Sequence, residues 1–437
     1  MTGVARDPGQ AGRDGTATAG TGTAPAGPAP EVPLRRNRDF TLLWTGTAVS
    51  SLGTQISLIA YPLLVLGATG SAAKAGLVGG ATLIGALLML LPAGVVADRY
   101  PRKRIMITTS LVELAAVGTV AVAVLAGRII LAQLATVGFV QGVAEAFYLG
   151  ANRGAIRRIV PSSQLPAAMA RTQARDQAAA LAGPPAGGAL FSLARFLPFA
   201  VDSVSFAAIT VAAALLRKPL DPVRVAGETR EPLRRSVGKG LRFVIGEPFL
   251  RTVAIWGALV NGVAAGMLLM VIVLARHRGA TPAEVGLLLS INAGCGLAGS
   301  VLAPRLVALL PGRVIALITS WLLPTCAVVI ANAPWVWLIG VMGAVTTFTV
   351  QPVNVIMTAR AAHITPDDLQ AQASNASLLL KWSLMWAGPP AFGALADRLG
   401  TPSAVLIAAA LYAAAAVWLQ FNRGLRGLND PLVASAV

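Results

Sequence analysis

Charged residues are scarce in this chain. Only 12% of its 437 residues are Asp, Glu, Lys or Arg, about half the share found in a typical soluble domain. Histidine and cysteine are scarcer still, with two of each, so the sequence offers no metal-ligand cluster and no disulfide framework. It also lacks the Gly-x-x-x-x-Gly-Lys-Ser/Thr loop that cradles nucleotide phosphates. We therefore expect no metal, no cofactor and no catalytic residues, and neither an ATP-driven pump nor an enzyme.

Apolar residues fill the chain instead. They make up 55% of the sequence, and the mean hydropathy is +0.70. Apolar runs of about 20 residues are long enough to cross the hydrocarbon core of a bilayer as helices. The sequence therefore predicts an all-α membrane protein with twelve spans, at residues 40–68, 75–97, 104–126, 129–151, 167–191, 197–216, 249–275, 283–304, 313–331, 334–357, 371–395 and 402–422.

A polar segment, residues 217–248, divides the spans into two six-helix bundles at residues 39–216 and 249–423. This linker carries eight Lys or Arg. Residues 1–38 are rich in Gly, Ala, Thr and Pro and have too little apolar surface to fold alone, so we expect a disordered tail. Residues 424–437 are expected to form a second, shorter tail.

The positive charge is distributed along the chain in a way that predicts its orientation. The net charge is +17, but the cations lie in the connections between spans, which argues against a nucleic-acid partner. With the N-terminal tail in the cytoplasm, the cytoplasmic segments, counted together with the cytoplasmic ends of the adjoining spans, hold 28 of the 35 Lys and Arg. This asymmetry fits the positive-inside rule. Both termini are therefore expected in the cytoplasm, and the abundance of Ala, Gly and Arg suggests a bacterial plasma membrane.

The two halves of the chain repeat one another. Residues 182–185 read Ala-Gly-Pro-Pro, and so do residues 387–390, at an offset of 205. The same offset relates Gly188-Ala189-Leu190 to Gly393-Ala394-Leu395. Six spans is an even number, so both copies insert in the same orientation. This predicts a parallel repeat with a substrate path between the halves.

Residues 94–104, which we call the basic turn, connect two apolar runs. The basic turn contains four cations and the carboxylate of Asp98 within a few residues. So many fixed charges are not stable in hydrocarbon, so the basic turn must lie at a membrane surface.

These features together resemble the major facilitator superfamily. Gly94 followed by Asp98-Arg99 and further basic residues matches its signature between spans 2 and 3. The run Gly183-Pro184-Pro185-Ala186-Gly187-Gly188 matches the core of a motif of drug/proton antiporters. The beginning, from Asn37 to Gly53, resembles the branch that contains macrolide and enterobactin exporters. The chain departs from many drug antiporters at Gly138, three residues before Gln141-Gly142, where they carry an Arg.

The resemblance implies that the basic turn is a conformational latch. Gly94 would let two helices approach closely, and Asp98 could accept hydrogen bonds from the N-terminus of a neighbouring helix. Arg99 and Arg102 could bridge to carboxylates or to lipid phosphates. The charge pattern by itself supports only the alternative, an anchor that sets the topology.

The Gly-Pro run in the fifth span predicts a break or a kink in the helix and a close helix contact. Proline removes a backbone hydrogen bond, and glycines allow another helix to approach. We expect Gly183, Pro184, Gly187 and Gly188 to contribute to gating or sealing, because the position is copied in the eleventh span. The alternative is that prolines are simply common in membrane helices.

Ionisable residues inside the predicted spans are candidates for proton coupling. Glu145 follows Gln141 by one helical turn, so both lie on one face, although Glu145 could instead pair with Arg153 or Arg157. Glu113 lies nearer the cytoplasmic side and could pair with Arg104.

Asp176 and Lys381 occupy the same position in the two repeats, because they are 205 residues apart. They could pair across the cavity, or each could face water and carry a proton. A structural alternative for Asp176 is a pair with Arg175 or Arg171.

The sequence therefore predicts a secondary active transporter of the plasma membrane. By resemblance, it would act as a monomer among membrane lipids, exporting a hydrophobic or amphipathic small molecule, such as a drug, natural product or siderophore, in exchange for protons. An importer or lipid transporter of the same fold is the alternative, and a receptor that binds without transport is another.

Overall fold

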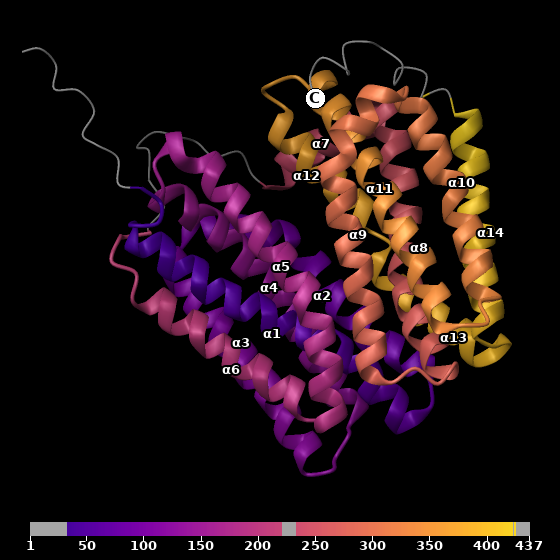
Figure 1. The fold of residues 1–437 in the computed structure, drawn as a ribbon. Coiled ribbons are helices and arrows are strands. Elements are labelled where there is room, and N and C mark those ends of the chain that lie inside the picture. Colours follow the sequence, from indigo (N-terminus) through magenta and orange to yellow (C-terminus); the bar gives the residue numbers. More distant parts are fainter. Residues whose placement is uncertain (1–32, 221–232, 423, 425–437) are drawn as a thin grey trace, which may run out of the picture.

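The fold is known from a computed structural model that describes residues 33–220, 233–422 and 424, and these residues form helices and no strand. The expected tails fall largely outside the described residues. Figure 1 shows the first half of the chain as one tilted bundle and the second half as another beside it. The first bundle contains α1 (Arg38–Thr69), α2 (Ala72–Arg99), α3 (Arg102–Leu125), α4 (Leu131–Ile159), the short η1 (Ser162–Gln164), α5 (Leu165–Leu193) and α6 (Leu197–Ala214).

The second half begins with a helix that the sequence did not predict. Its elements are α7 (Leu233–Gly246), α8 (Pro248–His277), α9 (Pro282–Leu309), α10 (Gly312–Ala331), α11 (Val336–Ile364), α12 (Gln370–Trp382), the short η2 (Met385–Ala387), α13 (Gly388–Leu399) and α14 (Thr401–Phe421). Helix α7 lies within the expected linker. Its Gly240 packs against the backbone of Gln372 in α12, where a side chain would collide.

Ten of the described helices are long and apolar enough to cross a membrane. Two expected spans, 167–191 and 371–395, are not among those ten. The first is the 29-residue helix α5, which includes Arg171, Arg175 and Asp176. The second is divided into α12, η2 and α13.

The break or kink that the Gly-Pro run predicts occurs as a break in the span at 371–395. Pro389 and Pro390 have no N–H to continue the preceding turn, and α13 begins beside them. In α5, Pro184 and Pro185 lie within a continuous helix. The residues ahead of them differ, since Ala178–Ala180 are strong helix formers and Ser383–Met385 include weaker ones. The break therefore distinguishes the two repeats.

Side-chain caps begin several helices. Asn37 Oδ1 accepts from the Phe40 amide at 3.1 Å at the start of α1, and Ser71 Oγ accepts from Lys74 at 3.2 Å in α2. A capping box between Thr281 and Glu284 begins α9. These caps satisfy amide groups that a helix leaves free.

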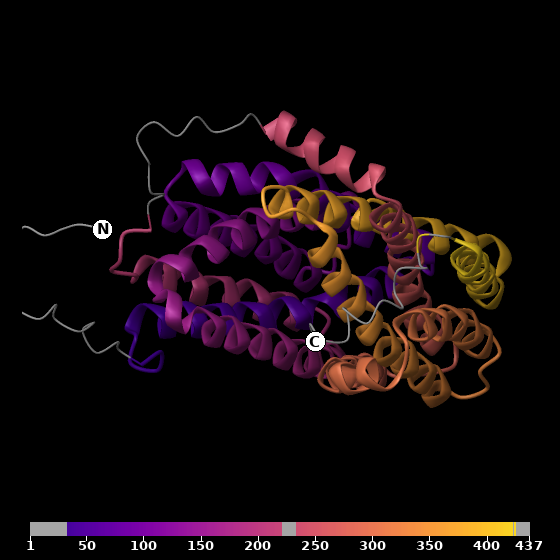
Figure 2. The same cartoon turned by 90° about the horizontal axis from the view of Figure 1, so that it is seen from above.

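The two bundles meet at one end of the molecule. We call the end with the start of α1, the start of α8 and the end of α14 the terminal end, and the other the opposite end. In Figure 1 the ribbons of the bundles diverge toward the terminal end, at the top, and converge below. The view in Figure 2, turned by 90°, shows α7 above α12 at the edge of the molecule.

Two glycine contacts join the bundles, and they are related by the repeat. At Gly188 of α5, a side chain would collide with the backbone of Pro282 at the start of α9, and at Gly393 of α13 it would collide with Ala72 at the start of α2. Gly286 and Gly76 complete the pairs, against the backbones of Pro184 and Pro389. Ser290 Oγ also donates to the Leu181 carbonyl at 2.6 Å. These contacts between the described parts of the two halves thus gather toward the opposite end.

Candidate functional site

A polar cavity of about 200 Å³ lies inside the first bundle, between α1, α3, α4 and α5. We call it the carboxylate pocket, because Glu113, Glu145 and Asp176 line it. Glu113 lies 11 residues after the start of α3, or about 16 Å from the terminal end by the helical rise. The hydroxyl groups of Thr47, Ser50, Ser51, Thr54, Ser110 and Tyr148 add to its polar wall.

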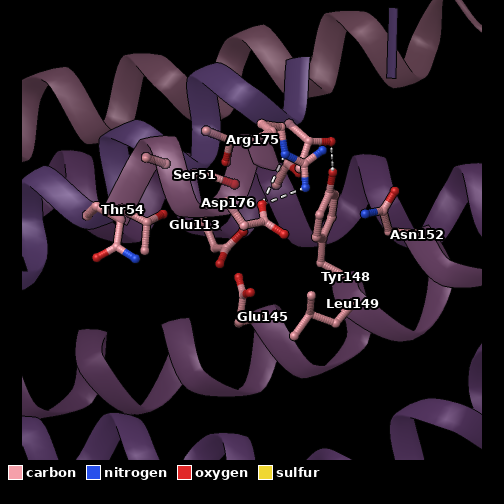
Figure 3. Close-up of a pocket in the computed structure, with 14 residues that line it drawn as sticks. Ser51, Thr54, Glu113, Glu145, Tyr148, Leu149, Asn152, Arg175 and Asp176 are labelled. Carbon is pink, nitrogen blue, oxygen red and sulfur yellow. Dashed lines mark hydrogen bonds and ion pairs between the residues drawn. The ribbon is translucent and has the colours of Figure 1, made fainter. Parts of the chain in front are cut away.

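One carboxylate in the pocket has a cationic partner. Arg175 donates from Nε and Nη2 to Asp176 Oδ1 at 3.0 and 2.8 Å, and Figure 3 shows the two side chains together. The Arg175 side chain is 6% exposed and that of Asp176 is 46% exposed. The structural alternative for Asp176 is therefore the arrangement observed, and pairing with Lys381 is not.

Glu113 and Glu145 have no such partner. Their side chains point toward each other in Figure 3, and they are close enough for their charges to interact. No hydrogen bond or ion pair joins either carboxyl to another described residue, so the expected alternatives, Arg104, Arg153 and Arg157, do not neutralise them. Glu113 is 3% exposed. The two helices α3 and α4 thus bring together two candidates that the sequence placed separately.

Two facing carboxylates suit a site that binds a cation. Like charges at short range in a poorly solvated cavity repel strongly, so the pair is stabilised by a shared proton or by a bound cationic group. Other polar atoms nearby are also unsatisfied: Ser110 Oγ and Asn152 Oδ1 are buried without a hydrogen-bond partner. The pocket therefore has unused capacity to bind a proton or a polar ligand.

Another carboxylate, the buried Asp202 in α6, was missed by the sequence analysis. It is fully buried and accepts from Ser57 Oγ of α1 at 2.5 Å, while its Oδ1 has no hydrogen-bond partner. Its position within the predicted span 197–216 is the same signal that singled out Glu113. Beside it in α1, Tyr61 donates to Gln141 Oε1 at 2.8 Å, so Gln141 binds α1 and is not a free neighbour of Glu145.

Lys381 lies in the other bundle, at the end of α12. Its aliphatic stem packs against Gly257 of α8. No hydrogen bond or ion pair links its ammonium group to another described residue. Lys381 therefore marks the break in the eleventh span and is not part of the carboxylate pocket.

The comparison with protein families agrees with the fold. The family model of the Major Facilitator Superfamily matches residues 43–387. The chain belongs to the major facilitator superfamily. It is thus a membrane transporter and not an enzyme. In the described part of the chain, no group of three or more His, Cys, Asp or Glu is placed to hold a metal ion.

Relatives of this superfamily member include drug exporters. It is 26% identical over 369 residues to the multidrug efflux pump Tap of Mycobacterium tuberculosis and of Mycobacterium bovis, covering 80% of this chain and 86% of Tap.

Solved structures show the same fold. A bacterial homologue of the human lysosomal transporter Spinster has a TM-score of 0.68 at 14% identity, covering 92% of this chain and 98% of that one. The nucleoside transporter NupG has a TM-score of 0.71 at 12% identity, with 87% and 99% covered.

The glycine of the superfamily signature makes no close helix contact in this conformation. Gly94 is exposed, and a side chain there would meet nothing within 4 Å, so the expected close helix approach is absent. The Asp98 side chain is 62% exposed and lies 3.8 Å from Arg102 of its own turn. Arg102 also packs on Gly154 of α4, and Arg99 is exposed. The basic turn thus lies open at the terminal end.

The Gly-Pro run of α5 forms the close contacts that the sequence predicted at its glycines. A side chain at Gly183 would collide with Gln55 of α1, and one at Gly187 would collide with Ile56. Gly188 and Pro184 contact the start of α9, across the two halves. The run therefore has one glycine pair within its own bundle and a contact to the other bundle, although α5 remains helical through both prolines.

Proposed function

We propose that this transporter exports a hydrophobic or amphipathic small molecule from a bacterial cytoplasm in exchange for protons. The observation that carries the proposal is the carboxylate pocket, in which the unpaired Glu113 and Glu145 face each other inside a membrane bundle. The similarity to Tap supports the export direction and the cargo class. Protons would bind the carboxyl pair from one side and leave it toward the other.

The proposal assigns a direction to the observed conformation. With the terminal end in the cytoplasm, as the distribution of Lys and Arg supports, the bundles are joined at the outer side and apart at the inner side. The described contacts at Gly188 and Gly393 would then seal the outer side. The Spinster homologue with the same fold is described as inward-facing. The present state would be one of two that the cycle needs.

The basic turn would close the inner side in the other state. A side chain at Gly94 would meet nothing within 4 Å here, so this face of α2 has room for a neighbouring helix. We further propose that the protein acts as a monomer within the lipids, because both bundles of the repeat lie in one chain.

Transport assays in everted membrane vesicles test the proposal. We expect ethidium or tetraphenylphosphonium, two lipophilic cations, to accumulate in vesicles whose interior is acidified. Adding either cation should also reduce the pH gradient, and an uncoupler should abolish accumulation. Uptake that does not depend on the pH gradient would exclude proton exchange. Accumulation only in right-side-out vesicles would favour an importer instead.

A further inference from the structure

A carboxylate joins the two bundles at the opposite end. Asp397, near the end of α13, accepts three hydrogen bonds from the start of α2. Its Oδ2 accepts from Ser71 Oγ at 2.6 Å and from the Ala73 amide at 3.1 Å. Its Oδ1 accepts from the Ala72 amide at 2.8 Å. An anion is stabilised at this position, because the first amides of a helix are free and the helix dipole is positive there.

The residues around Asp397 repeat the superfamily signature. Residues 393–398 read Gly-Ala-Leu-Ala-Asp-Arg, and residues 94–99 read Gly-Val-Val-Ala-Asp-Arg. In both copies the glycine precedes the aspartate by four residues, so the two lie on one helix face. The first copy lies where α2 ends, at the terminal end, and the second lies where α13 ends, at the opposite end.

The two copies are in different states in this structure. At Gly393 the helices are so close that a side chain would collide with the backbone of Ala72 and Ala73, whereas at Gly94 it would meet nothing. Asp397 also makes three hydrogen bonds to the other bundle. The copy that is engaged lies at the end where the bundles meet.

The repeat partner of this contact lacks the carboxylate. Ser192 is the residue 205 positions before Asp397, and its Oγ donates to the Gly188 carbonyl of its own helix at 2.9 Å. The start of α9 is instead capped by its own Thr281 and Glu284. Close helix contact at the repeat-related site of α5 and α9 therefore forms without such a carboxylate, so packing alone does not account for Asp397.

We propose that Gly393, Asp397 and residues 71–73 form a reversible clamp, here called the α2–α13 clamp, that holds the bundles together at the opposite end. The α2–α13 clamp is the counterpart of the basic turn. It carries the same six-residue pattern at the other end of the molecule. The clamp bonds when the bundles are joined at the opposite end, and the basic turn would bond when they are joined at the terminal end. Opening toward the opposite end requires Asp397 to leave the start of α2. The inference needs only that the bundles alternate, and depends on neither cargo nor proton exchange.

Spin-label distances in the purified full-length protein test the clamp without any substrate. Cys295 and Cys326 are replaced by Ala, and one label pair is placed at the opposite end with Arg128→Cys and Asn332→Cys. A second pair at the terminal end uses Arg158→Cys and Arg305→Cys. The two pairs should move in opposite senses when the molecule switches, so they separate a change of state from general loosening.

At the opposite end, Asp397→Asn should increase the ratio of open to closed molecules by about two- to fivefold. This is the range expected for a charge at an exposed helix terminus. The opposite-end label distance lengthens and the terminal-end distance shortens. Ser71→Ala, which removes one donor and keeps the carboxylate, should act in the same direction more weakly and provides the test if Asp397→Asn does not fold.

Ser192→Ala, at the repeat-related position, is the matched control and should leave both distances unchanged. The clamp is overturned if the label distances in Asp397→Asn and in Ser71→Ala are both the same as in the parent protein. It is equally overturned if Ser192→Ala shifts them as much as Asp397→Asn does. A failure of the transport assays alone would bear on export and not on this clamp.

Discussion

At the scale of single residues, the carboxyl groups of this protein differ in what surrounds them. Asp176 is held by Arg175 at 2.8 Å, and Asp202 by Ser57. Glu113 and Glu145 face each other and make no hydrogen bond or ion pair with another described residue. Carboxyl groups that already have a partner bind a proton less readily than an unpaired pair. The unpaired pair is thus the better candidate for coupling.

Replacing the pair should uncouple transport from protons. In Glu113→Gln/Glu145→Gln we expect gradient-driven uptake of ethidium to fall by about tenfold or more, because no group remains to exchange the proton. The measurement is the collapse of the pH gradient on adding cargo to everted vesicles. Asp367→Asn/Asp368→Asn removes two exposed carboxylates and should retain full activity. Normal coupling in the Glu double variant would move the proton site elsewhere.

The α2–α13 clamp should be insensitive to pH in the physiological range. Partial burial opposes ionisation of Asp397, but the hydrogen bonds from Ser71, Ala73 and Ala72, with Lys74 nearby, together lower the pKa of this carboxyl below its usual range. A lowered carboxyl pKa means that the stabilisation is complete above the ordinary value of about 3.9 and is lost only as pH falls further. Opposite-end label distances should therefore match at pH 8 and pH 6. A lengthening at pH 6 would contradict this.

At the scale of elements, the eleventh span shows what a repeated sequence does not control. The same Gly-Pro-Pro lies inside the continuous helix α5 and at the start of α13. Ala178–Ala180 keep α5 helical, while the chain leaves the α-helix after Trp382. The glycine contacts with α9 and α2 are kept in both halves. The two halves thus share the close approach of the helices and not the continuity of the helix.

Two glycines of α2 allow a matched test of that close approach. A side chain at Gly76 would collide with the backbone of Pro389, whereas one at Gly79 would lie 3.8 Å from the Pro389 side chain, an ordinary contact. Gly76→Ala should destabilise the joined state by about 1–3 kcal/mol, as overpacking does, and transport should fall.

Gly79→Ala is the control and should transport normally with parent-like label distances. Spin-label distances at the opposite end, measured beside transport, report whether the bundles have separated. Equal behaviour of the two variants would mean that the contact at Gly76 adapts without cost.

At the scale of the whole molecule, the two bundles must separate at one end and join at the other for the transporter to alternate. The state that is joined at the terminal end needs a contact of its own. The basic turn lies where that contact would form, and in this state a side chain at its Gly94 would meet nothing within 4 Å. A molecule without it would remain in the present conformation. Alternation then stops, although both bundles still fold and insert.

Asp98→Asn should therefore reduce transport strongly while leaving membrane insertion and the melting temperature intact. It should also shift the spin-label distances in the sense opposite to Asp397→Asn, because it weakens the other end. Unchanged transport would remove the latch role and leave the basic turn as a topology anchor.

The sequence by itself determined the membrane class, the superfamily and most of the helices. Apolar runs of bilayer length are local features of the sequence. Helix caps such as Asn37 and the charged residues at the ends of the spans are local features too. The candidates Glu113, Glu145 and Asp176 were found for the same reason, because a charge within an apolar run is visible without a fold.

Only the tertiary structure decided which of those charges meet. Whether Asp176 faces Arg175 or Lys381 depends on how helices rotate and pack, and no local pattern encodes a distance between residues far apart in the chain. The same holds for the helix α7 against α12, and for Asp397 at the start of α2, 325 residues away from Ala72. The conformational state is also a property of the packed whole, since one sequence must permit two arrangements of nearly equal free energy.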